Sequence, residues 1–147
     1  MAARAIVDTG FLVALLDGND GHHEWAKGLV GSLRGPWLTA EACVSEVVFL
    51  LEQAGRAPLD ALFRWLGEEL LVSQHVLPEQ LAAVRAEMVA YPPRWVDFAD
   101  ACLVVLSDES PKLPVVSVDV ADFSVYFRRR RGRKLLLPKV AAQRRKR

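Results

Sequence analysis

Four carboxylates in this 147-residue chain lie in apolar sequence, where an acid is costly to bury unless a partner neutralises its charge. Two of them follow short β-branched runs, Ala5-Ile6-Val7 and Val115-Val116-Ser117-Val118. A third lies inside the mainly apolar stretch 42–51, and a fourth lies in the stretch 96–101. The four acids are Asp8, Asp119, Glu46 and Asp100.

Their spacing allows these acids to meet. If the two β-branched runs are neighbouring parallel strands, Asp8 and Asp119 project from the same edge of a sheet. Asp97 and Asp100 are three residues apart, so on a helix they share one face. Like charges in one cleft repel and raise each other's pKa unless a cation lies between them. A site made of oxygen ligands, with no Cys and no essential His, suits Mg²⁺ or Mn²⁺. Metal-dependent nucleases use such ions.

Each acid taken singly has an ordinary explanation as a helix cap, a turn residue or an ion-pair partner. Asp97 follows a Pro-Pro break and could cap the helix that it begins. Asp17 and Asp122 have the surroundings of turn acids. The metal hypothesis therefore depends on a set of acids meeting, rather than on any single one: Asp8, Glu46, Asp100 and Asp119.

The elements that would position these acids alternate between strand and helix, which predicts one domain built as a parallel α/β sandwich. Thr39 is expected to cap the helix that follows the second strand. Strands are predicted at residues 4–8, 37–39, 70–76, 114–118 and 135–137, and helices at 11–16, 22–33, 40–54, 58–70, 78–89 and 96–106.

The composition is that of a folded globular protein, with 52% hydrophobic residues and no apolar run of the roughly 18 to 20 residues that a membrane span needs. No signal peptide is apparent. Cys43 and Cys102 lie in apolar helical patterns, which indicates buried free thiols and a cytoplasmic protein. The tryptophans fit packing in a core or interface better than base stacking: Trp25, Trp37, Trp65 and Trp95.

Basic residues are concentrated at the C-terminus. Residues 128–147 hold 11 of the 19 Lys and Arg and no acid. The first 127 residues carry 8 basic and 18 acidic side chains, a net charge of −10. The runs at 128–133 and 144–147 either attract phosphate non-specifically, with a steep dependence on salt, or form a solvated, disordered end. The sequence supports the two interpretations about equally.

The order of these motifs resembles the PIN-domain ribonucleases, and within them the toxin subunits of VapBC-type toxin–antitoxin modules. The resemblance covers residues 6 to about 138. Each motif alone is weak, whereas four in this order make a fairly specific signal. The motifs are Ile6-Val7-Asp8-Thr9 before a short apolar helix, Glu46 within an apolar helix, Asp97-Phe98-Ala99-Asp100-Ala101, and Ser117-Val118-Asp119-Val120-Ala121-Asp122-Phe123.

This resemblance implies a fold and an activity. The fold is a three-layer α/β/α sandwich over residues 1–138, with a central, mostly parallel sheet of four or five strands, followed by a basic tail at 139–147. The activity is that of a Mg²⁺-dependent (or Mn²⁺-dependent) endoribonuclease. The implied partners are RNA, a small antitoxin whose C-terminal segment fills the cleft, and a second copy of the chain bound through helical faces such as Trp65 and Leu66.

The resemblance also assigns roles by position. Four acids would be catalytic: Asp8, Glu46, Asp100 and Asp119. Three of these would hold the metal: Asp8, Asp100 and Asp119. Glu46 would complete the coordination shell of the metal or act as a base toward water. Three residues would support the site: Thr9, Asp97 and Ser117. The hydroxyl of Thr9 would orient Asp8 or a bound water.

Two positions depart from the family pattern. Gly10 stands where an Asn is frequent, which predicts a looser first turn, and Val118 replaces a hydroxyl residue next to Asp119. Two other functions stay open from the residues alone. A metal-dependent phosphatase would use Asp8 as its nucleophile, but its second acid is missing at Gly10. A non-catalytic binding module would keep the fold without competent geometry.

Overall fold

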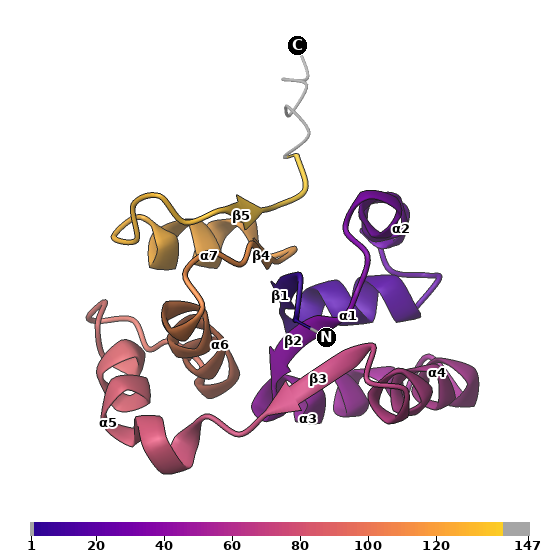
Figure 1. Ribbon diagram of the computed structural model, residues 1–147, viewed down its shortest axis with the longest axis horizontal. Coiled ribbons are helices and arrows are strands. Elements are labelled where there is room, and N and C mark those ends of the chain that lie inside the picture. Colours follow the sequence, from indigo (N-terminus) through magenta and orange to yellow (C-terminus); the bar gives the residue numbers. More distant parts are fainter. Residues whose placement is uncertain (1, 140–147) are drawn as a thin grey trace.

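Five strands form a single parallel sheet in the computed structural model, which describes residues 2–139 (Figure 1). The strand order is β3-β2-β1-β4-β5, so β1 lies at the centre with β2 and β4 beside it. The predicted central parallel sheet is confirmed. Four strands are shorter than the sequence indicates, and the strand that begins at Trp37 extends one residue further, to Ala40. The five strands are β1 (Ala5–Val7), β2 (Trp37–Ala40), β3 (Leu71–Gln74), β4 (Val115–Val116) and β5 (Leu135–Leu136).

Within residues 2–139 there are seven helices, one more than the sequence predicts. The additional helix covers residues 120–127, for which no element was predicted. The predicted cap at Thr39 is wrong, because the third helix begins at Glu41 and the buried Thr39 hydroxyl donates to the carbonyl oxygen of Val7 at 2.7 Å. The helices are α1 (Thr9–Leu16), α2 (His23–Ser32), α3 (Glu41–Leu51), α4 (Arg56–Gly67), α5 (Leu77–Met88), α6 (Phe98–Glu109) and α7 (Val120–Phe127).

The sheet separates two hydrophobic cores. Successive residues of a strand point to opposite faces, so Ala5 and Val7 belong to one buried cluster and Ile6 to the other. The first cluster packs under α1, α2 and α4, and the second under α5, α6 and α7 (Figure 1). Helix α3 contributes Val47 to the first cluster and Cys43 to the second. The predicted three-layer α/β/α architecture is therefore confirmed.

An ionic cluster fastens the segment after α7 to α5 and α6. The Arg130 side chain, 12% exposed, donates to both carboxylate oxygens of Asp108 and to Oε2 of Glu87. Arg133 donates to Asp108 and to the carbonyl oxygen of Ser107. These two arginines belong to the 128–133 run, so part of the charge that was expected to attract phosphate or solvate the chain end is engaged inside the fold.

Three of the four tryptophans pack in the molecule as predicted. The Phe11 ring makes edge-to-face contacts with Trp25 and Trp37, at centroid distances of 6.1 and 5.6 Å. Trp65 packs edge-to-face on Trp37 at 6.4 Å. Trp95 differs from the other three because 72% of it is exposed, so packing in the core is wrong for this residue.

Both cysteines are buried free thiols, as predicted. Burial raises the pKa of Cys43 to about 12 and that of Cys102 to about 11, so both stay protonated at neutral pH. Among residues 2–139 no helix combines the length and the apolar character needed to cross a membrane. Of the basic tail predicted at 139–147, residues 140–147 lie outside the described part of the chain.

Candidate metal centre

The carboxyl ends of β1 and β4 bring two candidate acids to one edge of the sheet. The two strands pair in parallel, with Ile6 opposite Val115 and Val7 opposite Val116. Asp8 directly follows β1, and residue 119 follows β4 after a two-residue connection. The strands are therefore the parallel neighbours that the sequence suggested. This edge is where ligand sites gather in parallel α/β sheets.

Ser117 connects the two acids. Its hydroxyl donates to Oδ2 of Asp8 at 2.6 Å and accepts from the backbone N–H of Asp119 at 2.9 Å. The other oxygen of Asp8, Oδ1, accepts from the backbone N–H of Phe11 at 2.8 Å. Asp8 is only 3% exposed, so these two hydrogen bonds offset part of the cost of burying a carboxylate.

Three acids at this edge also begin helices. Asp8 is the N-cap of α1, Asp97 of α6 and Asp119 of α7, and each side chain accepts from a backbone N–H three residues later. Such a carboxylate satisfies a donor that the helix leaves free, and the positive end of the helix stabilises it. The capping role suggested for Asp97 is confirmed. The N-termini of three helices thus converge on one place.

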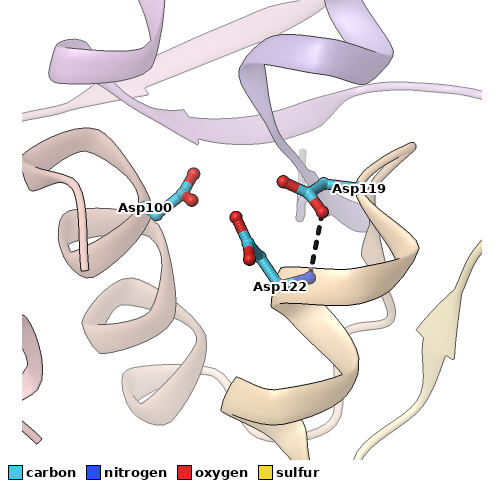
Figure 2. A group of neighbouring side chains, drawn as sticks. All are labelled: Asp100, Asp119 and Asp122. Carbon is cyan, nitrogen blue, oxygen red and sulfur yellow. Dashed lines mark hydrogen bonds between the residues drawn. The ribbon is translucent and has the colours of Figure 1, made fainter. Parts of the chain in front are cut away.

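Asp100, Asp119 and Asp122 lie close enough together to share a cation (Figure 2). One carboxylate oxygen of each lies within 4.8 Å of the other two. The backbone N–H of Asp122 donates to Oδ1 of Asp119 at 2.9 Å. The sequence indicated a turn acid at residue 122, whereas the structure brings its carboxylate into this group. Its spacing of three from Asp119, at a helix start, was the signal that could have revealed it.

A cavity of about 330 Å³ opens beside this group. Glu46 of α3 lines it, and the Thr9 hydroxyl donates to Oε1 of Glu46 at 3.5 Å. The structure therefore directs Thr9 toward Glu46 rather than toward Asp8. All four acids expected to be catalytic line the cavity together with two more, which makes six: Asp8, Glu46, Asp97, Asp100, Asp119 and Asp122.

Burial and mutual repulsion raise the pKa values of these acids. Burial raises the pKa of Asp8 to about 6, although the hydrogen bonds from Ser117 and Phe11 oppose the shift. Burial, followed by the charge of Asp97 and then of the other acids, raises the pKa of Asp100 to about 7. The pKa of Glu46 is raised by burial and by Asp97. The ionised acids are therefore not fully compensated by positive charge.

Arg94 provides part of that charge. Its guanidinium group pairs with the carboxylate of Asp122. Burial raises the pKa of Asp119, and the nearby positive charge of Arg94 opposes this shift. One arginine beside six acids still leaves a large excess of negative charge in the cavity.

The donor set fits a hard divalent cation. Among the described residues that line the cavity there is no Cys and no His, and the acids offer only carboxylate oxygens. Such a set suits Mg²⁺ or Mn²⁺ better than zinc, whose structural sites use Cys and His. A divalent cation would also neutralise the charge that raises the pKa of Asp100.

Gly10 and Val118 contact each other at the wall of this cavity. A β-carbon added at Gly10 would lie 2.5 Å from Cγ2 of Val118 and 3.8 Å from Oδ1 of Asp8. The looser turn expected at Gly10 is not seen, because α1 begins at Thr9 and includes this glycine. The two departures from the family pattern are therefore in contact. The absence of a side chain at Gly10 makes room for the side chain of Val118.

Besides Asp122, three residues at the cavity were not expected from the sequence. Trp95 and Tyr126 line it, and Arg94 reaches it through Asp122. Tyr126 lies one helical turn after Asp122, so helical periodicity could have placed it there. Arg94 and Trp95 belong to the connection before α6, and no sequence spacing relates them to the acids.

Comparisons with known proteins identify the family to which this fold belongs. The family model described as the PIN domain matches residues 5–137. A search of curated proteins found no significant match. Among solved structures, the chain is similar to Mycobacterium tuberculosis VapC20, which is described as a sarcin-ricin loop cleaving toxin. The two are 26% identical, with a TM-score of 0.70, over 82% of this chain and 93% of that chain. The resemblance seen in the sequence is confirmed, and the chain belongs to the PIN domain family.

Proposed function

We propose that this protein is a Mg²⁺-dependent endoribonuclease and the toxin of a VapBC-type toxin–antitoxin pair. The observation that carries the proposal is the cavity at the ends of β1 and β4, which six carboxylates line in a chain of the PIN domain family. The activity described for the similar VapC20 supports RNA as the substrate class. The two free cysteines are in keeping with action in the reducing cytoplasm.

In this proposal Asp8, Asp100 and Asp119 hold Mg²⁺, or Mn²⁺ in its place. Asp122 is a further candidate ligand because its carboxylate lies within 4.8 Å of two of them. The bound ion supplies positive charge that stabilises the phosphoryl oxygens and lowers the pKa of a water molecule. Glu46 is the proposed base, since a raised pKa makes its ionised form a better proton acceptor than an ordinary glutamate.

The proposed reaction is in-line hydrolysis of a phosphodiester. A water oxygen forms the new bond to phosphorus while the bond from phosphorus to the 3′ oxygen breaks. Glu46 accepts a proton from the water, and the leaving oxygen takes a proton from solvent, which gives 3′-hydroxyl and 5′-phosphate ends. The hydrogen bond from Ser117 orients Asp8, and the one from Thr9 orients Glu46. The acids are thus held in place before a substrate arrives.

The two other functions have less support. A phosphatase that uses Asp8 as its nucleophile needs a second acid two residues later, and Gly10 occupies that position. The gathering of six carboxylates around one cavity favours a metal-dependent activity over a non-catalytic binding module.

The nuclease proposal is tested by RNA cleavage with and without EDTA, in the wild type and in Asp8→Asn. We expect EDTA to abolish cleavage, and Asp8→Asn to lower the rate at least roughly 100-fold, the upper end of the loss that supporting residues cause at metal sites. Asp60→Asn, on the exposed face of α4, is the matched control and should cleave normally. Cleavage that survives both EDTA and Asp8→Asn would refute the proposal.

The antitoxin is the proposed protein partner. An apolar hollow of about 400 Å³ between α3, β3, α5 and α6 supports this assignment, with Val76, Leu77 and Phe98 among its walls. A second hollow shares Phe98 with it and shares Glu46 and Asp97 with the acidic cavity. An extended peptide with apolar side chains and a terminal arginine complements this series of hollows. We expect expression of the chain to arrest growth. Co-expression of a small protein encoded by an adjacent gene should relieve this arrest.

A homodimer is also part of the proposal. Trp65 and Leu66, which the resemblance suggested for the contact, pack against the core that α1, α2 and α4 cover. Exposed apolar side chains on the neighbouring surfaces of α3 and α4 support a second copy there instead, namely Phe49, Leu50 and Phe63. Sedimentation of the wild type and of Phe49→Glu would distinguish a dimer at this face from a monomer.

A further inference from the structure

Trp95 is a large exposed aromatic side chain at the rim of the acidic cavity. It is 72% exposed and is also one of the residues that line the cavity. Single exposed hydrophobic residues are common on protein surfaces. Trp95 differs from such residues because it lies beside six carboxylates and directly follows Arg94 in the chain.

Arginine and aromatic side chains continue away from Trp95 along the same edge. Arg94 pairs with Asp122 at the cavity. Tyr91 forms a β-bridge with Arg94, and the guanidinium carbon of Arg129 lies 5.1 Å from the centroid of the Tyr91 ring. We define Tyr91, Arg94, Trp95 and Arg129 as the arginine–aromatic edge. Arg94 and Trp95 lie at the border of the acidic cavity. Tyr91 packs on the cavity-lining Tyr126 at a centroid distance of 5.8 Å and connects this border to Arg129.

This edge is held in place by the fold. The backbone N–H of Arg94 donates to the carbonyl oxygen of Tyr91 at 2.9 Å. On the other side of Trp95, the fully buried Val96 donates its N–H to Met88 at 3.0 Å. The Tyr91 hydroxyl donates to Oε1 of Glu87 at 3.1 Å. The indole thus projects from a fixed backbone, which lowers the entropy cost of holding a ligand against it.

We propose that the arginine–aromatic edge binds single-stranded RNA next to the cleavage site, with Trp95 stacked on a base and Arg94 in contact with a backbone phosphate. Aromatic side chains alternating with arginines are the surface that single strands use, because every base has a stacking face and every linkage a charge. The inference rests on the proposed ribonuclease function and names the residues that position its substrate.

The charge of the edge favours RNA over a basic peptide. The guanidinium groups of Arg94 and Arg129 attract phosphates and would repel an arginine placed on the edge itself, whereas the acidic cavity accepts the arginine proposed for the antitoxin. In contact with RNA, Arg94 can exchange the carboxylate of Asp122 for a phosphate oxygen, which is an equally good bidentate partner. The acidic cavity beside it then keeps its carboxylates for a cation.

The test measures RNA binding separately from cleavage. Tryptophan fluorescence of Asp8→Asn, in which cleavage is slowed, is titrated with a short single-stranded RNA pool of random sequence in the presence of Mg²⁺. We expect quenching, because Trp95 is the exposed indole of the described chain. Trp95→Leu in the same background should remove the quenching and weaken binding roughly 5- to 150-fold by filter assay, the range for loss of one stacked base. Trp95→Phe should retain most of the affinity.

Leu81→Ala is the matched control, since Leu81 is 66% exposed on α5 and does not line the cavity. It should bind RNA like the parent. Unchanged RNA affinity in Trp95→Leu overturns the inference, as does quenching by a short arginine-containing peptide but not by RNA. If the wild type binds RNA through Trp95 but cuts none, the proposed hydrolysis fails and the binding edge stands. If the wild type cuts RNA and Trp95→Leu has an unchanged KM, only the inference fails.

Discussion

The contact between Gly10 and Val118 shapes the wall of the cavity next to Asp8. The first turn of α1 carries Asp8 as its N-cap, and Gly10 follows two residues later. Val118 occupies the space that a side chain at Gly10 would need. Since a β-branched side chain has few rotamers, it cannot easily move away. These two residues therefore form one packing unit, although 108 positions separate them in the sequence.

Gly10→Ala is expected to destabilise the protein. Forcing a methyl group against Val118 costs about 1–3 kcal/mol, partly offset by the roughly 0.5–1 kcal/mol that alanine gains over glycine in a helix. Val118→Ala removes the clash, so the double variant should be more stable than the sum of the single changes predicts, by more than about 0.5 kcal/mol. Urea unfolding of the four chains measures this coupling. Additive free energies of unfolding would show that the two positions are independent.

At the scale of elements, helix starts and one ionic cluster hold the cavity together. Helices α1, α6 and α7 each begin at an acid that lines the cavity, so the ends of these helices fix the positions of the acids. Near the C-terminal end of α6, Arg130 connects the segment after α7 to Glu87 of α5 and Asp108 of α6. Through Glu87 this cluster also contacts Tyr91, and hence the arginine–aromatic edge.

Arg130→Met should be strongly destabilising. It leaves the buried carboxylate of Glu87, 6% exposed at its side chain, without its cation, and breaking a buried pair in this way costs about 3–5 kcal/mol. Arg131→Met, at the exposed neighbouring position, should change the free energy of unfolding by less than about 0.5 kcal/mol. Adding Glu87→Gln to Arg130→Met should restore part of the loss in urea unfolding. Equal effects of the two arginine changes would contradict the assigned role of the cluster.

At the scale of the whole molecule, the acidic cavity makes stability depend on pH and on metal. Asp8 and Asp100 ordinarily have a pKa of 3.8, and folding raises these to about 6 and about 7. The folded state therefore prefers the protonated acids. The stability that comes from protonation of these two acids is fully present below pH 3.8. It is lost as the pH rises through about 6 for Asp8 and about 7 for Asp100.

Without metal, we expect Asp8→Asn to become more stable relative to the wild type as the pH rises through about 6, because the neutral amide carries no charge to bury. Mg²⁺ at about 100 times its Kd should add roughly 2.7 kcal/mol to the wild type at alkaline pH, and much less to Asp8→Asn. Thermal unfolding at several pH values, with Mg²⁺ or EDTA, measures both effects. A difference between the two chains that does not change with pH would contradict the buried charge at Asp8.

The sequence by itself determined the layers of the fold and which acids could meet at one edge of the sheet. Short β-branched runs between amphipathic helices can bury both faces only as a parallel sheet between helical layers, which is why the five strands were predictable. Asp8, Glu46, Asp100 and Asp119 were identifiable because an acid in apolar surroundings needs a reason to be there. Helix α7 was missed because its residues favour strands locally, and packing of Phe123 and Tyr126 on the core, after the Asp119 cap, makes it helical.

Only the tertiary structure decided which side chains surround those acids. Asp122, Arg94 and Trp95 reach the cavity through the connection before α6 and the first turn of α7, and their relation depends on how these segments pack in space. The contact of Gly10 with Val118, and the engagement of Arg130 within the fold, likewise join residues far apart in the chain. Local patterns report what a residue can do, whereas long-range packing fixes its neighbours, and the neighbours determine its pKa, its exposure and its partners.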